Sequence, residues 1–218
     1  MPTPIANILL RKDFVEIAQL QDETIEGLYE LDPKIVLHGG TAIWRCYNGN
    51  RFSYDIDAYV SSERELNAVA NELTFTVRRR GGQLDKLNII ERTAMGQVSD
   101  GHARVKLDIM YQRKPVKSII KEYTRIDGTL FNVLTLSAED FIIEKVGAYG
   151  SRGYLRDLYD IYHLINYVGD KTKIREALLD FLRDIEKPSN RNDLEMIVYA
   201  GVAPSFDEMI DYIRVKLE

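Results

Sequence analysis

Two carboxylates alternate with apolar residues in the segment 54–60, which has the period of a β-strand. Asp55 and Asp57 would project from one face of that strand. Two adjacent carboxylates repel each other, and a divalent metal with oxygen ligands relieves that repulsion. A solvated edge strand is the simpler interpretation of this motif taken alone. The opposite face is predicted to enter the core, with Tyr54, Ile56, Ala58 and Val60.

A third carboxylate, Asp108, lies in the middle of a second predicted strand, 103–111. Aspartate is disfavoured in the middle of a strand, so its presence calls for a reason. If the two strands are neighbours, Asp108 converges with Asp55 and Asp57. Three carboxylates can hold two Mg²⁺ ions about 3.5–4 Å apart, the arrangement used for in-line phosphoryl or nucleotidyl transfer.

The tripeptide Gly39-Gly40-Thr41 lies between a predicted strand, 35–38, and a predicted helix from 39 to about 47. Glycines let the backbone approach a ligand closely, and amide groups at a helix N-terminus attract phosphate. The Thr41 hydroxyl would add a donor. Taken alone, the tripeptide is better explained by a tight turn with Thr41 as the helix cap. The chain has no Walker loop and no Gly-x-Gly-x-x-Gly fingerprint.

The elements that position these residues predict an α+β fold. A mixed sheet flanked by helices forms a first domain, 1–136, and a helical bundle forms a second, 137–218. Helices are expected at 13–31, 39–47 and 62–80 in the first domain, with strands at 35–38, 54–60, 87–92, 103–111, 116–123 and 130–134. After Ser137, a capping residue, the predicted helices are 138–150, 155–168, 171–186, 191–200 and 205–217.

Composition excludes several classes of protein. The chain has 218 residues, one cysteine, 29 basic and 34 acidic residues, and a net charge of −5. The acidic balance argues against a protein that coats nucleic acid with its whole surface. The absence of an apolar run of about 20 residues and of a signal-peptide pattern favours a cytoplasmic protein without a membrane contact. Arg78-Arg79-Arg80 would contact RNA phosphates or complement a helix C-terminus.

Charged residues recur in the helical half. Asp157 and Asp160 are three positions apart and share one face of the predicted helix 155–168. Asp160 and Arg156 are four apart, so a local salt bridge is the simpler interpretation. Lys145 lies on a largely apolar helix, where its stem would extend to solvent or its charge would face an anionic ligand.

The order of these motifs resembles the AbiEii/AbiGii family of nucleotidyltransferase toxins, in the DNA polymerase β-type superfamily. The resemblance begins at Leu37-His38-Gly39-Gly40-Thr41-Ala42 and continues through Asp57. It extends to Glu144-Lys145-Val146-Gly147-Ala148 and to Arg156-Asp157-Leu158-Tyr159-Asp160, and so spans residues 37–160. The resemblance implies a nucleotidyltransferase-like sheet.

The resemblance also implies a role for each matching residue. Metal ligands would be Asp55 and Asp57, with Asp108 as third ligand or as base for the acceptor hydroxyl. Nucleotide-binding residues would be Gly39, Gly40, Thr41, Arg51, Ser53 and Lys145. The catalytic set would be Asp55, Asp57, Asp108, Lys145, Asp157 and Asp160.

The implied activity is transfer of a nucleoside monophosphate from a nucleoside triphosphate (NTP) to an acceptor hydroxyl, with Mg²⁺ or Mn²⁺. By resemblance the protein would be the toxin of a toxin–antitoxin or abortive-infection pair, with an antitoxin protein as a partner. The acceptor would be RNA, such as a tRNA 3′ end, or a protein. The alternatives are a non-catalytic nucleotide-binding interaction module of the same fold, and a phosphotransferase that moves the γ-phosphate.

Overall fold

The computed structural model describes residues 4–188 and 193–218, which fall into two compact units. The first unit runs to Cys46 and continues from Phe52 to Thr135. The second comprises Tyr47–Arg51 and the chain from Leu136 onward. The short segment Tyr47–Arg51 therefore packs with the second unit, although in sequence it lies within the first predicted domain.

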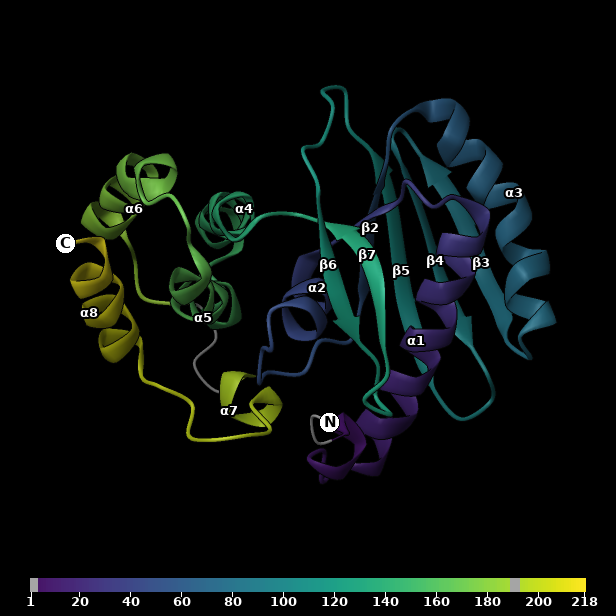
Figure 1. Cartoon of the computed structure of the whole chain (residues 1–218), viewed down its shortest axis with the longest axis horizontal. Helices are drawn as coiled ribbons and strands as arrows, with labels where there is room; N and C mark the ends of the chain where they lie inside the picture. The colour runs from purple at the N-terminus through teal and green to yellow at the C-terminus, as the bar shows by residue number, and fades with distance from the viewer. Residues whose placement is uncertain (1–3, 189–192) are drawn as a thin grey trace. The chain divides into compact units, whose positions relative to one another are not determined.

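A mixed seven-stranded sheet is the centre of the first unit (Figure 1). Its spatial order is β3-β4-β5-β2-β1-β7-β6. The pairs β2–β5 and β1–β7 are parallel, and the other neighbours are antiparallel. The strands are β1 (Val36–His38), β2 (Ile56–Val60), β3 (Gln83–Ile90), β4 (Thr93–Ser99), β5 (Arg104–Tyr111), β6 (Ile119–Thr124) and β7 (Leu130–Thr135).

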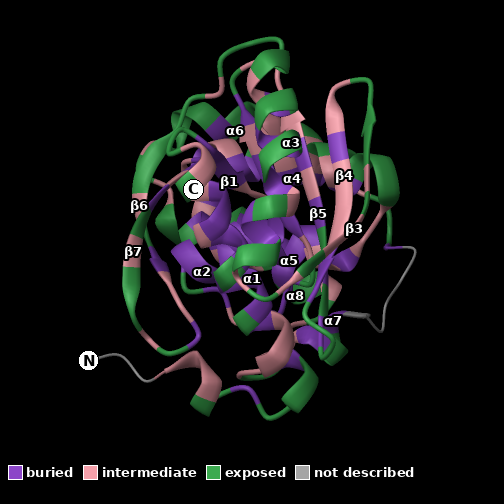
Figure 2. Cartoon of the chain, turned by 90° about the vertical axis from the view of Figure 1, so that its right-hand side faces the viewer, coloured by how far each residue is buried: buried purple, intermediate pink, exposed green. Residues whose placement is uncertain are grey.

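Three α-helices pack on this sheet: α1 (Lys12–Leu31), α2 (Gly39–Cys46) and α3 (Glu63–Arg79). α1 and α3 pack on each other and cover β4 and β5, whereas α2 contacts β1, β2 and β6. Ser62 caps α3 by accepting a hydrogen bond from the Glu65 amide. In β5 the apolar residues Val105, Leu107 and Ile109 are buried, and the residues between them are more exposed. Figure 2 shows exposed residues along β6 and β7, each of which also has buried positions.

The second unit is helical. Its α-helices among the described residues are α4 (Ala138–Arg152), α5 (Leu155–Leu164), α6 (Thr172–Asp184), α7 (Asp193–Ile197) and α8 (Phe206–Leu217). Ser137 begins α4 and accepts a hydrogen bond from the Asp140 amide, as the sequence predicts. Ser205 and Glu208 form a reciprocal capping box at the start of α8. Gly153, at φ +64°, ends α4 in the left-handed conformation that favours glycine.

Several predicted elements differ from the structure. The strand β4 is missing from the prediction, and β3 begins four residues earlier than expected. Alternation predicts Tyr54 in the core, but Tyr54 precedes β2 and is 38% exposed. The helix predicted at 155–168 is α5 followed by a 3-10 turn, Ile165–Tyr167. The predicted helix 191–200 is represented by α7, and its first two residues lie outside the described part of the chain.

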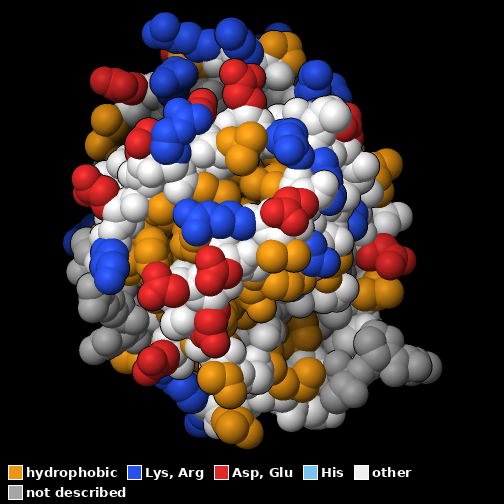
Figure 3. Space-filling model, turned by 90° about the vertical axis from the view of Figure 1, so that its left-hand side faces the viewer, with side chains coloured by type: hydrophobic (Ala, Val, Ile, Leu, Met, Phe, Trp, Pro, Cys, Tyr) orange, Lys and Arg blue, Asp and Glu red, His pale blue; other side chains and the backbone are white. Residues whose placement is uncertain are grey.

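The outer face of α6 and α8 carries cations and anions in close mixture around apolar side chains (Figure 3). Arg183 pairs with Asp180, and Arg214 lies 3.7 Å from Asp211, all of them exposed. This face therefore lacks the uniform positive charge that binds nucleic acid through its phosphates. Within residues 4–188 and 193–218, no helix combines the length and the apolar character needed to cross a bilayer.

Candidate active site

The first group of site residues lies where β2, β5 and β1 meet. β2 and β5 are parallel neighbours, and Asp57 lies directly opposite Asp108 in their register. On the other side of β2, Asp57 lies opposite His38, the last residue of β1. The condition for the carboxylates to converge, that the two strands are neighbours, is thus met. The two carboxylates share one face of the sheet, because residues opposite each other in a ladder point the same way.

Gly39 allows the Asp57 carboxylate to lie against the turn that follows β1. Gly39 has φ +69°, and a Cβ at this position would lie 2.1 Å from Asp57 Oδ2. Any side chain would therefore strain the backbone and overlap the carboxylate. The position of Asp57 therefore requires a glycine at residue 39. This contact links the Gly-Gly-Thr motif to the Asp-x-Asp motif, although Gly39 and Asp57 are 18 residues apart in the sequence.

Buried hydrogen bonds fix the segment that carries Asp55. The Thr41 hydroxyl donates to the Asp55 carbonyl at 2.5 Å, and Thr41 is fully buried. The Gln21 side-chain amide of α1 donates to the Ser53 carbonyl at 2.8 Å. The Thr41 hydroxyl is therefore engaged in holding the backbone before β2. Any contact of residues 39–41 with phosphate would depend on their amide groups.

Asp108 has two carboxylate oxygens in different environments. Its Oδ2 accepts a hydrogen bond from the Lys106 ammonium at 2.6 Å. Its Oδ1 is buried and has no hydrogen-bond partner among the described residues. The Asp108 carboxylate, aided by the charges of Asp55 and Asp57, outweighs partial burial and raises the pKa of Lys106 above its ordinary value. Lys106 is therefore a cation held among the three predicted metal ligands.

The donor set suits a hard divalent cation. Within residues 4–188 and 193–218, no three His, Cys, Asp or Glu side chains are gathered closely enough to form a ready metal site. However, Asp57 on β2, Asp55 just before β2 and Asp108 on β5 offer carboxylate oxygens, which Mg²⁺ prefers. The unpartnered, buried Oδ1 of Asp108 is an acceptor that a cation would satisfy. The residues present thus fit a magnesium or manganese ion.

The second group of site residues is a buried ionic network inside the helical unit. Asp160 on α5 accepts two hydrogen bonds from Arg51, at 2.5 Å from Nε and 2.6 Å from Nη2. The Lys145 ammonium of α4 lies 2.8 Å from Asp160 Oδ2 and 3.4 Å from Asp157 Oδ1. Arg152 binds both oxygens of Asp157 at 2.7 Å. Three cations thus surround two carboxylates.

Burial makes this network electrostatically strong. Asp157 and Asp160 are 0% exposed, Lys145 is 4% exposed and Arg51 is 5% exposed. Burial alone would raise the pKa of Asp160, but Arg51 and Lys145 outweigh it and hold that pKa below its ordinary value. Burial opposes the charge of Arg51 in the same way, and Asp160 nevertheless raises the pKa of Arg51. The ion pair therefore persists at neutral pH.

Two expectations about these helices are wrong. Asp160 does not pair with Arg156, because Asp160 points into the unit while the Arg156 guanidinium lies over the Tyr154 ring, 5.1 Å from its centroid. Lys145 does not extend to solvent, because two buried carboxylates hold its ammonium. The sequence also missed the true partner of Asp160. Arg51 is 109 residues away, and no local spacing signals their contact.

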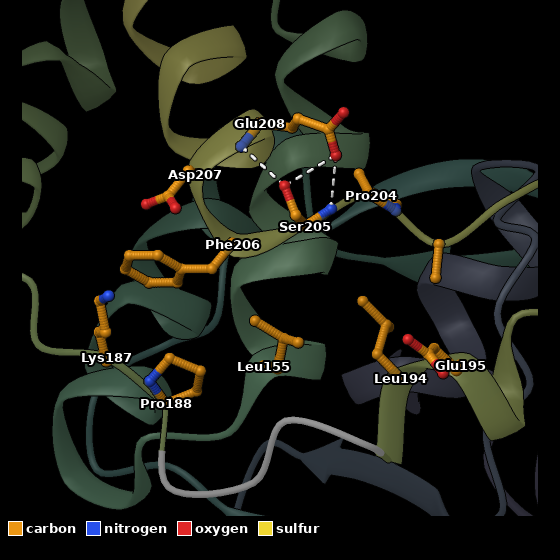
Figure 4. A pocket seen from close by; sticks show the side chains of 11 residues that line it. Leu155, Lys187, Pro188, Leu194, Glu195, Pro204, Ser205, Phe206, Asp207 and Glu208 are labelled. Atoms are coloured by element: carbon orange, nitrogen blue, oxygen red, sulfur yellow. Dashed lines mark hydrogen bonds between the residues drawn. The ribbon is translucent and has the colours of Figure 1, made fainter.

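The helical unit also has a cavity of about 360 Å³, whose lining includes none of the charged residues of the two groups described above (Figure 4). Leu155, Leu194, Pro188 and Phe206 form apolar walls, and none of the predicted site residues lines it. The capping box engages the Ser205 hydroxyl and a Glu208 oxygen, as the dashed lines show. Lys187, Glu195 and Asp207 also line the cavity, so its lining mixes apolar and charged side chains.

Comparison with solved structures supports the fold. The crystal structure of JHP933 from Helicobacter pylori superposes with a TM-score of 0.65 at 20% sequence identity, covering 95% of this chain and 91% of that one. A putative nucleotidyltransferase from H. pylori gives a TM-score of 0.61 at 19% identity, covering 95% and 94%. These likenesses show a nucleotidyltransferase fold. A search of curated proteins finds no match to the sequence.

The sequence itself identifies the family. The family described as "Nucleotidyl transferase AbiEii toxin, Type IV TA system" matches residues 26–211, a range that includes both groups of charged residues. The match covers most of the chain and contains the Gly-Gly-Thr turn, the three carboxylates and the helical network. The chain therefore belongs to the AbiEii family of nucleotidyl transferase toxins of type IV toxin–antitoxin systems.

Proposed function

We propose that the protein transfers a nucleoside monophosphate from an NTP to an acceptor hydroxyl and releases pyrophosphate, with Mg²⁺ or Mn²⁺ as cofactor. The observation that carries the proposal is the placement of Asp57 opposite Asp108 on parallel strands, with Gly39 packed against Asp57. Membership of a nucleotidyl transferase family supports the same reaction class.

In this proposal Asp55, Asp57 and Asp108 hold the metal. Bound there, the ion would neutralise triphosphate oxygens and lower the pKa of the acceptor hydroxyl. The backbone amides of Gly39 and Gly40 would face the phosphates at the start of α2. Thr41 and Ser53 act indirectly, because their hydrogen bonds fix the backbone before β2.

The reaction forms one bond and breaks one. The acceptor oxygen bonds to the α-phosphorus, the bond from that phosphorus to the bridging oxygen breaks, and pyrophosphate leaves with the electron pair. The acceptor proton passes to a carboxylate of the site, and Asp108 would take this role only as the alternative to ligating the metal.

The network of Arg51, Lys145, Asp157 and Asp160 has a positioning role in this proposal. The Lys145 ammonium is almost fully buried and already shared between two carboxylates. Such a closed network fixes α4, α5 and the segment 47–51 as one rigid group. Arg152 is its most exposed member, with 42% of its side chain accessible.

Label transfer tests the proposal. The protein is incubated with each α-³²P-labelled NTP, Mg²⁺ or Mn²⁺, and total cellular RNA, and the products are resolved as RNA and as protein. We expect label on one acceptor class, and we expect Asp57→Asn to abolish it. Asp180→Asn is the matched control, because it removes an exposed carboxylate from α6 in the other unit.

The outcomes separate the candidate reactions. Label on RNA, including tRNA, or on a protein identifies the acceptor class. Transfer from a γ-labelled but not from an α-labelled NTP would show a phosphotransferase instead. Metal-dependent nucleotide binding without any transfer would favour the non-catalytic interaction module. As a toxin, the protein would arrest growth on expression and be countered by an antitoxin partner, and Asp57→Asn should remove the toxicity.

A further inference from the structure

Lys106 is a cation within the proposed metal site, although no motif of the chain draws attention to it. It precedes Asp108 by two residues on β5, so both side chains project from the same face of the sheet. The Lys106 ammonium lies 2.6 Å from Asp108 Oδ2, and 53% of its side chain is accessible to solvent. Its charge also interacts with Asp55 and Asp57.

We infer that Lys106 is a built-in counter-ion that competes with the free metal for the carboxylates and binds the anionic nucleotide once the metal is in place. The inference rests on the proposed function and deepens it. It predicts that the site takes its metal chiefly together with a nucleotide.

Competition follows from charge. With Lys106 in place, the four side chains Asp55, Asp57, Lys106 and Asp108 carry a net charge of −2; without it they carry −3. A divalent ion entering this group meets the repulsion of the ammonium, which already holds Asp108 Oδ2. The ion must therefore displace Lys106 or bind beside it at an electrostatic cost.

Release of Lys106 creates a binding group for phosphate. Its stem is long and half exposed, so the ammonium can leave Asp108 Oδ2 without opening the core. A nucleotide that arrives with its metal brings negative charge, and the released ammonium then has a new anionic partner. The same lysine thus weakens the binding of free metal and strengthens the binding of the metal–nucleotide complex.

The test measures two affinities in Lys106→Met, which keeps the length of the side chain and removes its charge. Free Mn²⁺ binding is followed by electron paramagnetic resonance. Binding of the α,β-methylene analogues of the four ribonucleoside triphosphates at saturating Mg²⁺ is followed by calorimetry. Neither measurement requires turnover. Arg104→Met is the matched control, because Arg104 shares the strand face but lies two residues farther from Asp108.

We expect Lys106→Met to bind Mn²⁺ roughly tenfold more tightly, since a unit charge near the surface acts on a divalent ion about twice as strongly as on a monovalent one. We expect the same variant to bind the nucleotide analogue several-fold more weakly, and Arg104→Met to change neither affinity by more than about twofold. Structural damage would instead weaken both. Any other combination in a folded Lys106→Met overturns the inference.

Two further variants keep the test decisive. Lys106→Arg retains the charge, so its Mn²⁺ affinity should stay close to that of the wild type. Asp57→Asn should bind Mn²⁺ more weakly. If Asp57→Asn binds Mn²⁺ like the wild type, the proposed metal site fails and the inference fails with it. If Asp57→Asn weakens binding but Lys106→Met does not strengthen it, the proposed function survives and only the role of Lys106 is wrong.

Discussion

Asp160→Asn should destabilise the helical unit far more than an ordinary change of a salt-bridged aspartate. The substitution keeps the shape of the side chain but removes the charge that Arg51 and Lys145 share. Arg51 loses a bidentate partner at 2.5 and 2.6 Å, and it remains almost fully buried. Asp157 then faces the three cations alone.

Removing one member of a buried ion pair costs about 3–5 kcal/mol, because the other charge stays desolvated. In a protein of 150–250 residues, 1 kcal/mol corresponds to about 2–4 °C in Tm. We therefore expect Asp160→Asn to lower the Tm of the whole protein by roughly 10 °C. Asp180→Asn removes an exposed carboxylate that lies 2.8 Å from Arg183, and such pairs contribute about 0–1 kcal/mol.

Calorimetry and urea unfolding of the two variants provide the assay, at pH 7 and near pH 3. Because the folded pKa of Asp160 is lowered, its stabilisation is present above the unfolded pKa of about 3.9 and is lost as the pH falls through the folded value. The difference between wild type and Asp160→Asn should therefore shrink at low pH. The reasoning is refuted if Asp160→Asn and Asp180→Asn lie within about 1 kcal/mol of each other at pH 7.

Three other substitutions test separate parts of the structure. Gly39→Ala should destabilise by more than the ~1–2 kcal/mol expected from a left-handed alanine, because its Cβ would also overlap Asp57 Oδ2. Gly101→Ala, with φ +90° and nothing within 4 Å, should show only that backbone cost; equal losses in urea unfolding would contradict the overlap. Burial dominates the raised pKa of Asp22, although Arg45 opposes it. Its stabilising contribution should thus be largest below about pH 4 and decline as the pH rises through the folded pKa, so the loss caused by Asp22→Asn should be smaller at pH 7 than at pH 3. Arg156→Ala should change the free energy of unfolding by less than about 1 kcal/mol, because Arg156 contacts the Tyr154 ring and does not pair with Asp160; a loss comparable to that of Asp160→Asn would restore the local salt bridge.

Periodicity and capping predicted the helices well, whereas one central strand gave no signal. The pattern Ser-x-x-Asp at Ser137 marked the start of α4, and the structure has that cap. β4 reads Thr-Ala-Met-Gly-Gln-Val-Ser, which lacks a β-branched run and contains a glycine. Gly96 is there for packing, because a Cβ would lie 3.1 Å from a Leu87 methyl group. Tertiary fit between β3 and β4 therefore overrides local propensity.

The alternation of buried and exposed residues also gave a wrong prediction for the first residue of the predicted strand 54–60. Tyr54 has the parity of Ile56 and Ala58, but the strand begins only at Ile56. Its ring contacts the edges of Phe14 and Phe52, with centroids 5.8 and 5.0 Å away, while the side chain stays partly exposed. Residues alternate between the two faces only where the strand is hydrogen-bonded into the sheet. The sequence therefore predicts the presence of a strand more reliably than its boundaries.

Some features of the candidate site are recognisable from the local sequence, whereas others depend on contacts that the local sequence does not show. The carboxylates of β2 and β5 are visible in sequence, because aspartate is unusual in an otherwise apolar strand. Their adjacency depends on the sheet order, which the spacing of the residues does not reveal. The pairs Arg51–Asp160 and Lys106–Asp108 escaped prediction for opposite reasons. The first joins residues 109 positions apart, and the second joins residues so close that the alternation pattern treats them as two ordinary polar side chains.

These two ion pairs call for different interpretations of any loss of activity. Asp160 and Arg51 are closed to solvent and hold three segments together, so an inactive Asp160 variant is evidence about catalysis only if its unfolding free energy is unchanged. Lys106 is half exposed and pairs with Asp108 Oδ2 near the surface, so its removal should leave stability nearly intact. A change in metal affinity after Lys106→Met therefore reports on the site itself. For this fold, the informative substitutions are the exposed charges on β5, and the buried charges of α4 and α5 must be judged by stability first.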